Sequence, residues 1–328
     1  MKLLITGAAG FIGSHLVRTV LGPDKPLGDD VRVTVLDALT YAGNRAALAP
    51  VEDEPGFDFV HGDITDAPLV DRLVAAHDAV VHLAAESHVD RSIERADAFV
   101  RTNVLGTHTL LEAALRHGTG PFLHVSTDEV YGSVPVGSSV ETDPLAPNSP
   151  YAASKASSDL LALSYHRTHG LDVRVTRCSN NFGPYQYPEK VIPLFVTRLL
   201  TGAAVPLYGD GGNVRDWLHV DDHCRALLAV LTGGRPGETY NIGGGTELTN
   251  KELTGLLLDA CDAGWDRVEH VADRKGHDRR YSVDWTKIRT ELGYTPVHDF
   301  REGLAETVAW YRANRPFWAA SEAELQGA

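Results

Sequence analysis

Tyr151 and Lys155 stand four positions apart, in a segment whose pattern predicts a helix over residues 149–169. At this spacing both side chains leave the same face of a helix. A lysine ammonium beside a phenol lowers the pKa of the phenol, ordinarily about 10, so Tyr151 becomes a usable base near neutral pH. The alternative is a solvated pair on a helix surface, which arises often by chance. A nearby strand ending in Ser126-Thr127 favours the catalytic interpretation.

Two adjacent carboxylates, Asp128 and Glu129, follow directly after that strand. Neighbouring carboxylates at the carboxyl end of a buried strand are costly unless the protein uses them. A dehydration needs one group to take a proton from carbon and a second to protonate the departing hydroxyl. Asp128 and Glu129 supply such a pair. The alternative is a polar loop in which the carboxylates only cap the next turn.

Three glycines, Gly7, Gly10 and Gly13, follow the first apolar run and open a helical pattern. Glycines let the backbone turn tightly and approach a pyrophosphate, and a helix N-terminus there attracts negative charge. Asp37 lies 37 − 13 = 24 residues after Gly13, where an acidic side chain accepts hydrogen bonds from a ribose and repels a 2′-phosphate. This spacing favours NAD over NADP. A plain turn, with Asp37 as a cap, is the alternative, and the same holds for Asp63 near the expected adenine.

Apolar runs alternate with amphipathic stretches through the first half of the chain. This alternation predicts an α/β fold of the Rossmann type, a doubly wound parallel sheet. The predicted strands are residues 3–5, 31–36, 57–60, 79–83, 122–125 and 173–176, and two predicted helices are residues 99–115 and 149–169.

The pattern changes after about residue 180, where Gly-Pro pairs and loops break the periodicity. We expect an NAD-binding domain with the catalytic residues over 1–180. A smaller C-terminal α/β lobe over 181–328 would mainly bind substrate, with some segments returning to the sheet. Its predicted elements are short strands over 205–208 and 239–242 and helices near 221–231, 250–261 and 301–312.

The composition excludes several classes of protein. The 328 residues include 30 Lys or Arg and 44 Asp or Glu, a net charge of −14, which makes a poor binder of nucleic acid or anionic membranes. The three cysteines lack a Cys-x-x-Cys spacing, which argues against a disulfide framework or a structural zinc site. No apolar run approaches the roughly 18 residues of a membrane span. We expect a cytoplasmic protein with no metal, nucleic acid or membrane partner.

Taken together, the motifs resemble the extended short-chain dehydrogenase/reductase superfamily, in which Thr127, Tyr151 and Lys155 match the catalytic triad. Epimerases of that superfamily generally carry small or apolar residues where Asp128 and Glu129 stand. Within it, the chain resembles the dTDP-glucose 4,6-dehydratase family over essentially its whole length. Further matching runs are residues 39–44, 84–92, 177–185 and 273–278.

The resemblance implies tightly held NAD, the substrate dTDP-glucose and a set of contacts to each. Implied catalytic residues are Thr127, Asp128, Glu129, Tyr151 and Lys155. Implied cofactor contacts are Gly7, Gly10, Phe11, Ile12, Gly13, Asp37, Leu39, Thr40, Asp63, Ile64, Ala84, Ala85, Ser87, Thr102, Tyr151, Lys155 and Asn181. Implied substrate contacts are Ser87, His88, Thr127, Asn180, Glu189, Lys190, Pro206, Tyr208, Arg215, Asn250, Arg274 and His277. Glu86 and Asp90 stay open to a structural interpretation, and His277 and Tyr208 to a surface one.

The implied activity is that of a hydro-lyase. Tyr151 takes the proton of the sugar 4-OH during oxidation at C4, Glu129 removes the C5 proton, and Asp128 protonates the leaving C6 hydroxyl. Two alternatives stay open: a nucleotide-sugar 4-epimerase or other extended short-chain dehydrogenase, and a non-catalytic NAD-binding protein. We also expect a homodimer, because helical segments 99–116 and 149–167 carry small and apolar residues on more than one face.

Overall fold

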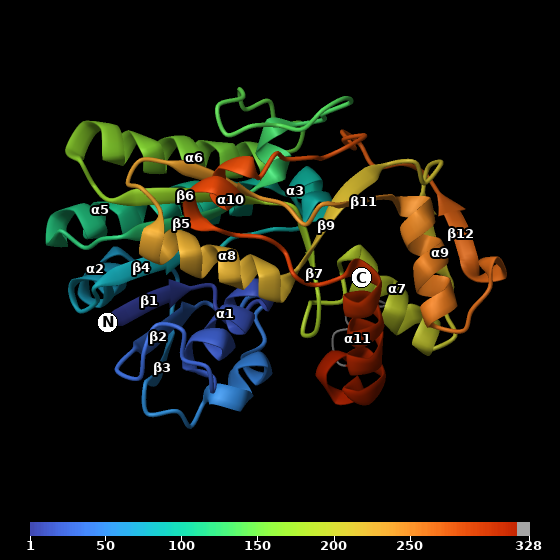
Figure 1. Cartoon of the computed structure of the whole chain (residues 1–328), viewed down its shortest axis with the longest axis horizontal. Helices are drawn as coiled ribbons and strands as arrows, with labels where there is room; N and C mark the ends of the chain where they lie inside the picture. Colours follow the sequence, from blue (N-terminus) through green and yellow to red (C-terminus); the bar gives the residue numbers. More distant parts are fainter. Residues whose placement is uncertain (320–328) are drawn as a thin grey trace.

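The computed structural model describes residues 1–319 and is built on a seven-stranded parallel sheet (Figure 1). The strand order is β10-β6-β5-β4-β1-β2-β3, with every neighbouring pair parallel. The strands are β1 (Lys2–Thr6), β2 (Arg32–Asp37), β3 (Phe57–His61), β4 (Ala79–His82), β5 (Phe122–Thr127), β6 (Val173–Cys178) and β10 (Thr239–Ile242). The six strands predicted for the first half of the chain are therefore confirmed, and so is the Rossmann-type fold.

Both faces of the sheet are covered, which explains why its strands are apolar without alternation. In β1, Leu3 and Ile5 join one core cluster while Leu4 joins the other. The first cluster lies under α1 (Phe11–Leu21), η1 (Arg45–Val51), α8 (Val220–Gly233) and α10 (Thr286–Leu292). The second lies under α2 (Ala67–Ala75), α5 (Thr107–His117) and α6 (Pro150–His169), which Figure 1 shows on the opposite face.

The helix expected over residues 99–115 is not one regular α-helix. Short helices α3 (Val89–Glu94) and α4 (Ala96–Phe99) lead into a π-helical stretch, η2 (Val100–Gly106), and α5 follows. A Cβ atom on Gly106 would lie 2.3 Å from Cδ1 of Ile64, so a glycine allows this stretch to pack against Ile64. By contrast, α6 is uninterrupted and begins where the side chain of Ser149 accepts a hydrogen bond from the N–H of Ala152.

A smaller group of elements lies beside the sheet, to the right in Figure 1. It contains a three-stranded sheet of β7 (Asn180–Phe182), β9 (Val214–His219) and β11 (Thr246–Thr249), and a pair of β8 (Val205–Tyr208) and β12 (Val268–Val271). Its helices are α7 (Val191–Leu200), α9 (Asn250–Ala260), α11 (Phe300–Ala313) and the short η4 (Trp265–Arg267), which surround a third core cluster.

Segments from beyond residue 180 do return to the main sheet. Strand β10 pairs with β6, and α8 packs on α1. The predicted helices at 221–231, 250–261 and 301–312 correspond to α8, α9 and α11. Residues 320–328 of the expected lobe lie outside the described residues. Among residues 1–319, no helix is long and apolar enough to cross a membrane.

Candidate active site

A cavity of about 650 Å³ lies where the main sheet meets the smaller group of elements. The carboxyl ends of β1, β2, β4, β5 and β6 open onto it, together with residues of the segments 186–198 and 274–281. In doubly wound sheets this edge is the place where ligands bind. Every sequence-predicted site residue except Leu39 lines the cavity.

The glycine turn forms a close backbone cradle at one end of the cavity. Gly7 has a φ of +72°, and a Cβ there would lie 2.5 Å from the backbone of Ala84. A Cβ on Gly13 would lie 2.6 Å from the carbonyl oxygen of Gly7. Helix α1 begins at Phe11, directly after this turn, so its free N–H groups face the cavity. The cradle therefore fits the pyrophosphate of a dinucleotide.

Asp37 holds the loop that follows β2. Its carboxylate accepts hydrogen bonds from the N–H of Ala9 and the N–H of Leu39, each at 2.8 Å. Burial raises the pKa of Asp37, and these two bonds oppose the rise. Leu39, predicted to contact the cofactor, does not line the cavity; its side chain packs against the core, and its N–H donates to Asp37.

Tyr151 and Lys155 are both buried on α6, facing the end of β5. Lys155 Nζ donates a 2.8 Å hydrogen bond to the carbonyl oxygen of Val125. Burial lowers the pKa of Lys155 to about 8. Burial also raises the pKa of Tyr151 well above its ordinary value, with further contributions from Glu129 and Cys178. The net shift at Tyr151 is upward rather than downward, because burial outweighs the hydrogen bond from the Thr127 hydroxyl, which acts to lower the pKa.

Asp128 and Glu129 begin η3 (Asp128–Tyr131), at the pocket end of β5. Asp128 is 3% exposed, and the Thr127 hydroxyl donates a 3.2 Å hydrogen bond to its Oδ1. Its Oδ2 has no hydrogen-bond partner within residues 1–319. Burial raises the pKa of Asp128 well above its ordinary value, and the charges of Glu129 and Asp216 raise it further. Asp128 therefore holds its proton to higher pH than an ordinary aspartate.

Glu129 lies in different electrostatic surroundings. Burial raises the pKa of its carboxyl, but the positive charges of Lys190, Arg215 and Arg274 oppose that rise. Tyr281 donates a 3.4 Å hydrogen bond to its Oε2. The pKa of both carboxyls is raised, but the balance of their neighbours differs: Glu129 and Asp216 outweigh Arg215 at Asp128, whereas three cations face the single carboxylate Asp278 at Glu129. This arrangement can provide an acid and a base at one place.

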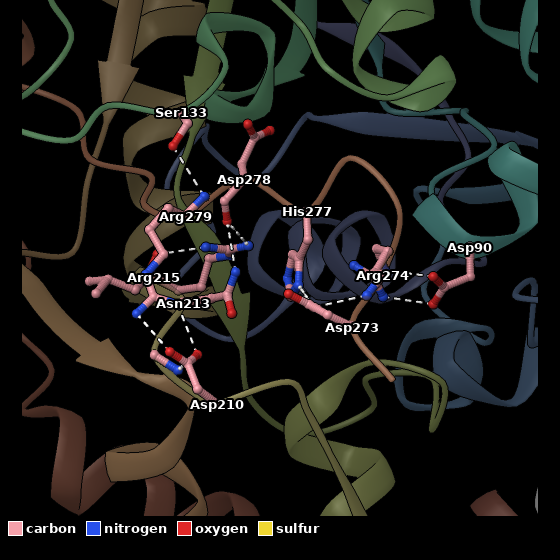
Figure 2. Close-up of polar contacts among 12 residues, drawn as sticks. Asp90, Ser133, Asp210, Asn213, Arg215, Asp273, Arg274, His277, Asp278 and Arg279 are labelled. Carbon is pink, nitrogen blue, oxygen red and sulfur yellow. Dashed lines mark hydrogen bonds and ion pairs between the residues drawn. The ribbon is translucent and has the colours of Figure 1, made fainter. Parts of the chain in front are cut away.

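Three basic residues expected from the sequence, Lys190, Arg215 and Arg274, line the cavity, and Figure 2 shows two of them, Arg215 and Arg274. Arg215 donates a 3.0 Å hydrogen bond to the carbonyl oxygen of Asp278 and lies 4.2 Å from the Tyr281 ring centre. Arg274 forms a two-point ion pair with Asp90. Lys190 donates a 2.7 Å hydrogen bond to the carbonyl oxygen of Ser87. An acidic chain therefore concentrates positive charge locally, as an anionic ligand requires.

Several residues at the cavity were missed by the sequence analysis. Tyr281 lines the cavity and lies three positions beyond the matching run 273–278, so its nearness to that run is the sequence signal that could have identified it. Asp216, whose charge acts on Asp128, is buried in β9 and hydrogen-bonds to Ser179, and no local pattern marks it. Glu189, expected at the substrate, also forms a 3.3 Å ion pair with Arg91.

A dinucleotide cradle and a tyrosine–lysine pair on one parallel sheet define the class of the extended short-chain dehydrogenases/reductases. The model of the family described as GDP-mannose 4,6 dehydratase matches residues 4–307, so the chain belongs to that family.

The similar proteins include dehydratases and an epimerase. A dTDP-glucose 4,6-dehydratase of Streptomyces antibioticus is 67% identical over 319 residues, which are 97% of this chain and 94% of the relative. A crystal structure of a dTDP-glucose 4,6-dehydratase from Streptomyces venezuelae with NAD bound has a TM-score of 0.96 at 63% identity, covering 98% of this chain and 100% of that one. The UDP-glucose 4-epimerase of Thermotoga maritima has a TM-score of 0.88 at 33% identity, covering 96% and 100%.

Proposed function

We propose that the protein is a hydro-lyase that converts dTDP-glucose into dTDP-4-keto-6-deoxyglucose and water, with NAD as a recycled cofactor. The observation that carries this proposal is the adjacent pair of the buried Asp128 and the half-buried Glu129, which line the cavity together with Thr127 and Tyr151. An epimerase has no use for this pair. The names and the 62–67% identity of Streptomyces and Actinoplanes relatives agree with the proposal. The product class is that of deoxysugar biosynthesis.

The first half of the proposed reaction takes place at Tyr151. When bound in the glycine cradle, NAD supplies a cationic ring that accepts electrons from sugar C4 and later returns them at C6. Tyr151 takes the proton of the sugar 4-OH once its phenol is ionised. The cationic ring of NAD, bound beside it, would favour the ionised form, and the Thr127 hydroxyl acts in the same direction. Lys155, four residues further along α6, is fixed by its hydrogen bond to the carbonyl oxygen of Val125.

The second half takes place at the two carboxyls. The new C4 carbonyl acidifies the C5–H bond, so Glu129 removes that proton. Asp128, which keeps its own proton because burial and nearby negative charge raise its pKa, delivers it to the C6 hydroxyl. The hydroxyl leaves as water, and Glu129 then returns a proton to C5. Hydride returned from the reduced cofactor would complete the C6 methyl group. The proton that Tyr151 took from the 4-OH passes through solvent to replace the one that Asp128 gave to the leaving water, so atoms and electrons balance over one turnover.

The division of the chain supports separate binding of cofactor and nucleotide sugar. In our proposal residues 1–180 hold NAD and the catalytic groups, and residues 181–328 mainly hold dTDP-glucose. Lys190, Arg215 and Arg274 line the cavity and offer charge to the diphosphate. The remaining proposed substrate contacts are Ser87, His88, Thr127, Asn180, Glu189, Pro206, Tyr208, Asn250 and His277.

The choice of NAD over NADP rests on Asp37. The carboxylate is 8% exposed and lines the cavity, so a 2′-phosphate there would meet a fixed negative charge. We expect cofactor released from denatured protein to be NAD. Predominant NADP in that extract would contradict the assignment.

We further propose a homodimer formed through α6 and η2. Leu160, Val100 and Leu105 are 57%, 56% and 48% exposed, a concentration of large apolar groups that a second copy would cover. Ala113 and Ala114, counted toward this surface in the sequence, are buried within the chain and do not contribute. Sedimentation at micromolar concentration should give a dimer, and a stable monomer would reject it. The three free cysteines fit the cytoplasmic location that we propose.

The experiment that tests the function is incubation with dTDP-glucose followed by mass spectrometry. The product should have lost one water, and deuterium placed at C4 of the substrate should appear at C6. A product of unchanged mass would indicate an epimerase. Purified protein that holds NAD but leaves nucleotide sugars unchanged would indicate a non-catalytic binding protein.

A further inference from the structure

One segment of the main domain, residues 87–91, is tied to the smaller group of elements across the cavity. Lys190 Nζ donates to the carbonyl oxygen of Ser87, and Arg274 pairs with Asp90. Asp90 directly precedes Arg91 near the start of α3, and Arg274 lies in the loop that follows β12. The two contacts therefore join residues 103 and 184 positions apart in the chain.

The Asp90–Arg274 pair has a specific two-point geometry. Nε of Arg274 donates to Oδ1 of Asp90 at 2.5 Å, and Nη2 donates to Oδ2 at 2.6 Å (Figure 2). The third nitrogen, Nη1, makes no hydrogen bond to any of the residues 1–319. Arg274 lines the cavity, and its side chain is 21% exposed. A guanidinium held at two corners presents its remaining N–H groups in a fixed direction.

A second arginine–aspartate ion pair in the same region does not line the cavity. Arg279 donates from Nη1 and Nη2 to the carboxylate of Asp210 at 2.9 and 3.2 Å. Figure 2 shows this pair on the opposite side of His277 from Arg274. Neither Asp210 nor Arg279 lines the cavity, and both side chains are more than half exposed. The two pairs share chemistry and differ in location, so one serves as a control for the other.

We propose that Asp90 is a positioning residue for the nucleoside diphosphate: it fixes the guanidinium of Arg274 so that the free edge meets the diphosphate. This inference rests on the proposed function. It also explains why an acidic side chain stands at an anion site. The charge of Asp90 by itself repels a diphosphate. Its ion pair with Arg274, however, orders that side chain before the ligand binds, so binding no longer carries the entropy cost of ordering a flexible arginine. The two effects have opposite signs, so affinity distinguishes them.

The test measures dTDP binding by calorimetry on the purified holoenzyme and, separately, turnover of dTDP-glucose. Asp90→Asn keeps the size of the side chain and removes its charge. We expect dTDP to bind about tenfold more weakly and KM for dTDP-glucose to rise by a similar factor, because a charge-assisted two-point contact is lost. kcat should change less than about twofold, since the diphosphate lies away from the reacting carbons. Asp90→Glu, which restores the charge, should recover most of the affinity.

Two further variants decide whether Asp90 acts through Arg274. Asp210→Asn, the matched control, should leave dTDP affinity unchanged. In an Arg274→Gln background, Asp90→Asn should have no further effect, because the group that it positions is gone. Thermal melting of each variant checks folding, and Asp90→Ser replaces Asp90→Asn if the latter does not fold.

Unchanged or tighter dTDP binding by Asp90→Asn would overturn the inference, and so would an equal loss in the Arg274→Gln background or in Asp210→Asn. Wild-type protein that neither binds dTDP nor converts dTDP-glucose would instead overturn the proposed function. The two failures are therefore distinguishable.

Discussion

Two buried aspartates in the same part of the molecule have pKa values shifted in opposite directions. Asp128 is 3% exposed at the pocket end of β5, and Asp159 is 0% exposed on α6. Burial raises the pKa of both, and at Asp128 the charge of Glu129 adds to the rise. At Asp159, the close approach of His124 and the charge of Arg177 outweigh burial, so the pKa is lowered.

The difference shows that the neighbouring groups, and not burial alone, set the pKa and therefore the protonation state of a buried carboxyl in this protein. Asp159 lies eight residues after Tyr151 on the same helix and receives a 2.9 Å bond from Nε of Arg177. His124 lies 3.2 Å away, on β5. Asp159 thus joins α6 to β5 and β6 as a permanent anion. Asp128 lines the cavity, its Oδ2 has no hydrogen-bond partner among residues 1–319, and its raised pKa lets it keep a proton to donate.

The largest effect should follow from removing the proton donor. Asp128→Asn should lower the rate of dehydration of dTDP-glucose by about 10²–10⁴-fold, the usual contribution of a general acid. Glu129→Gln should cause a loss in the same range, because it removes the base. The rate of keto-sugar formation, followed by its absorbance in base, measures both. A wild-type rate in both variants would mean that the pair is structural.

Removing the permanent anion should instead cost stability. Asp159→Asn leaves Arg177 buried without a counter-charge, which typically costs about 3–5 kcal/mol of unfolding free energy. The matched control is Asp262→Asn, which breaks a 3.0 Å pair between the exposed Asp262 and Arg312. That control should cost less than about 1 kcal/mol. Urea unfolding of the wild type, Asp159→Asn and Asp262→Asn measures these free energies. Equal losses of unfolding free energy in the two variants would contradict the proposed difference between the buried and the exposed pair.

The two aspartates should also affect the pH dependence of stability with opposite signs. Asp159, with a lowered folded pKa, contributes stability that is full above the ordinary pKa of about 3.9 and is lost as pH falls through the lower folded value. Asp128, with a raised folded pKa, destabilises the fold as pH rises above about 3.9 and through that raised value.

Asp128→Asn should therefore be more stable than the wild type at neutral pH, by about 1.4 kcal/mol for each unit of pKa shift. The gain should vanish below about pH 4, where the unfolded aspartate also holds its proton. Unfolding curves at neutral and acid pH measure the difference. An unchanged or lower stability at neutral pH would show that Asp128 is ionised without penalty.

The sequence predicted features that depend on local pattern. The six strands and the glycine turn follow from apolar runs and turn residues. All of the predicted site residues but Leu39 line the cavity, and most of them were implied by the family resemblance. The π-helical stretch at 100–106 was not foreseen, because the close approach of Gly106 to Ile64 is a tertiary contact.

The electrostatics were harder to predict than the positions. Lys155 was expected to lower the pKa of Tyr151, but its ammonium is directed to the carbonyl of Val125 and burial dominates both groups. The role of Asp159, on α6, was missed because its partner Arg177 comes from strand β6. Sequence spacing shows which side chains share a helix face, whereas their partners across the fold set their protonation.

The most direct test of the central claim, that Asp128 is the proton donor and Asp159 is not, is rapid mixing of Asp128→Asn holoenzyme with dTDP-glucose. The absorbance of reduced cofactor should appear and persist, because oxidation at C4 needs Tyr151 and not Asp128, while mass spectrometry finds no loss of water. Tyr151→Phe should give neither signal. Loss of water from the sugar at the wild-type rate in Asp128→Asn would contradict the account.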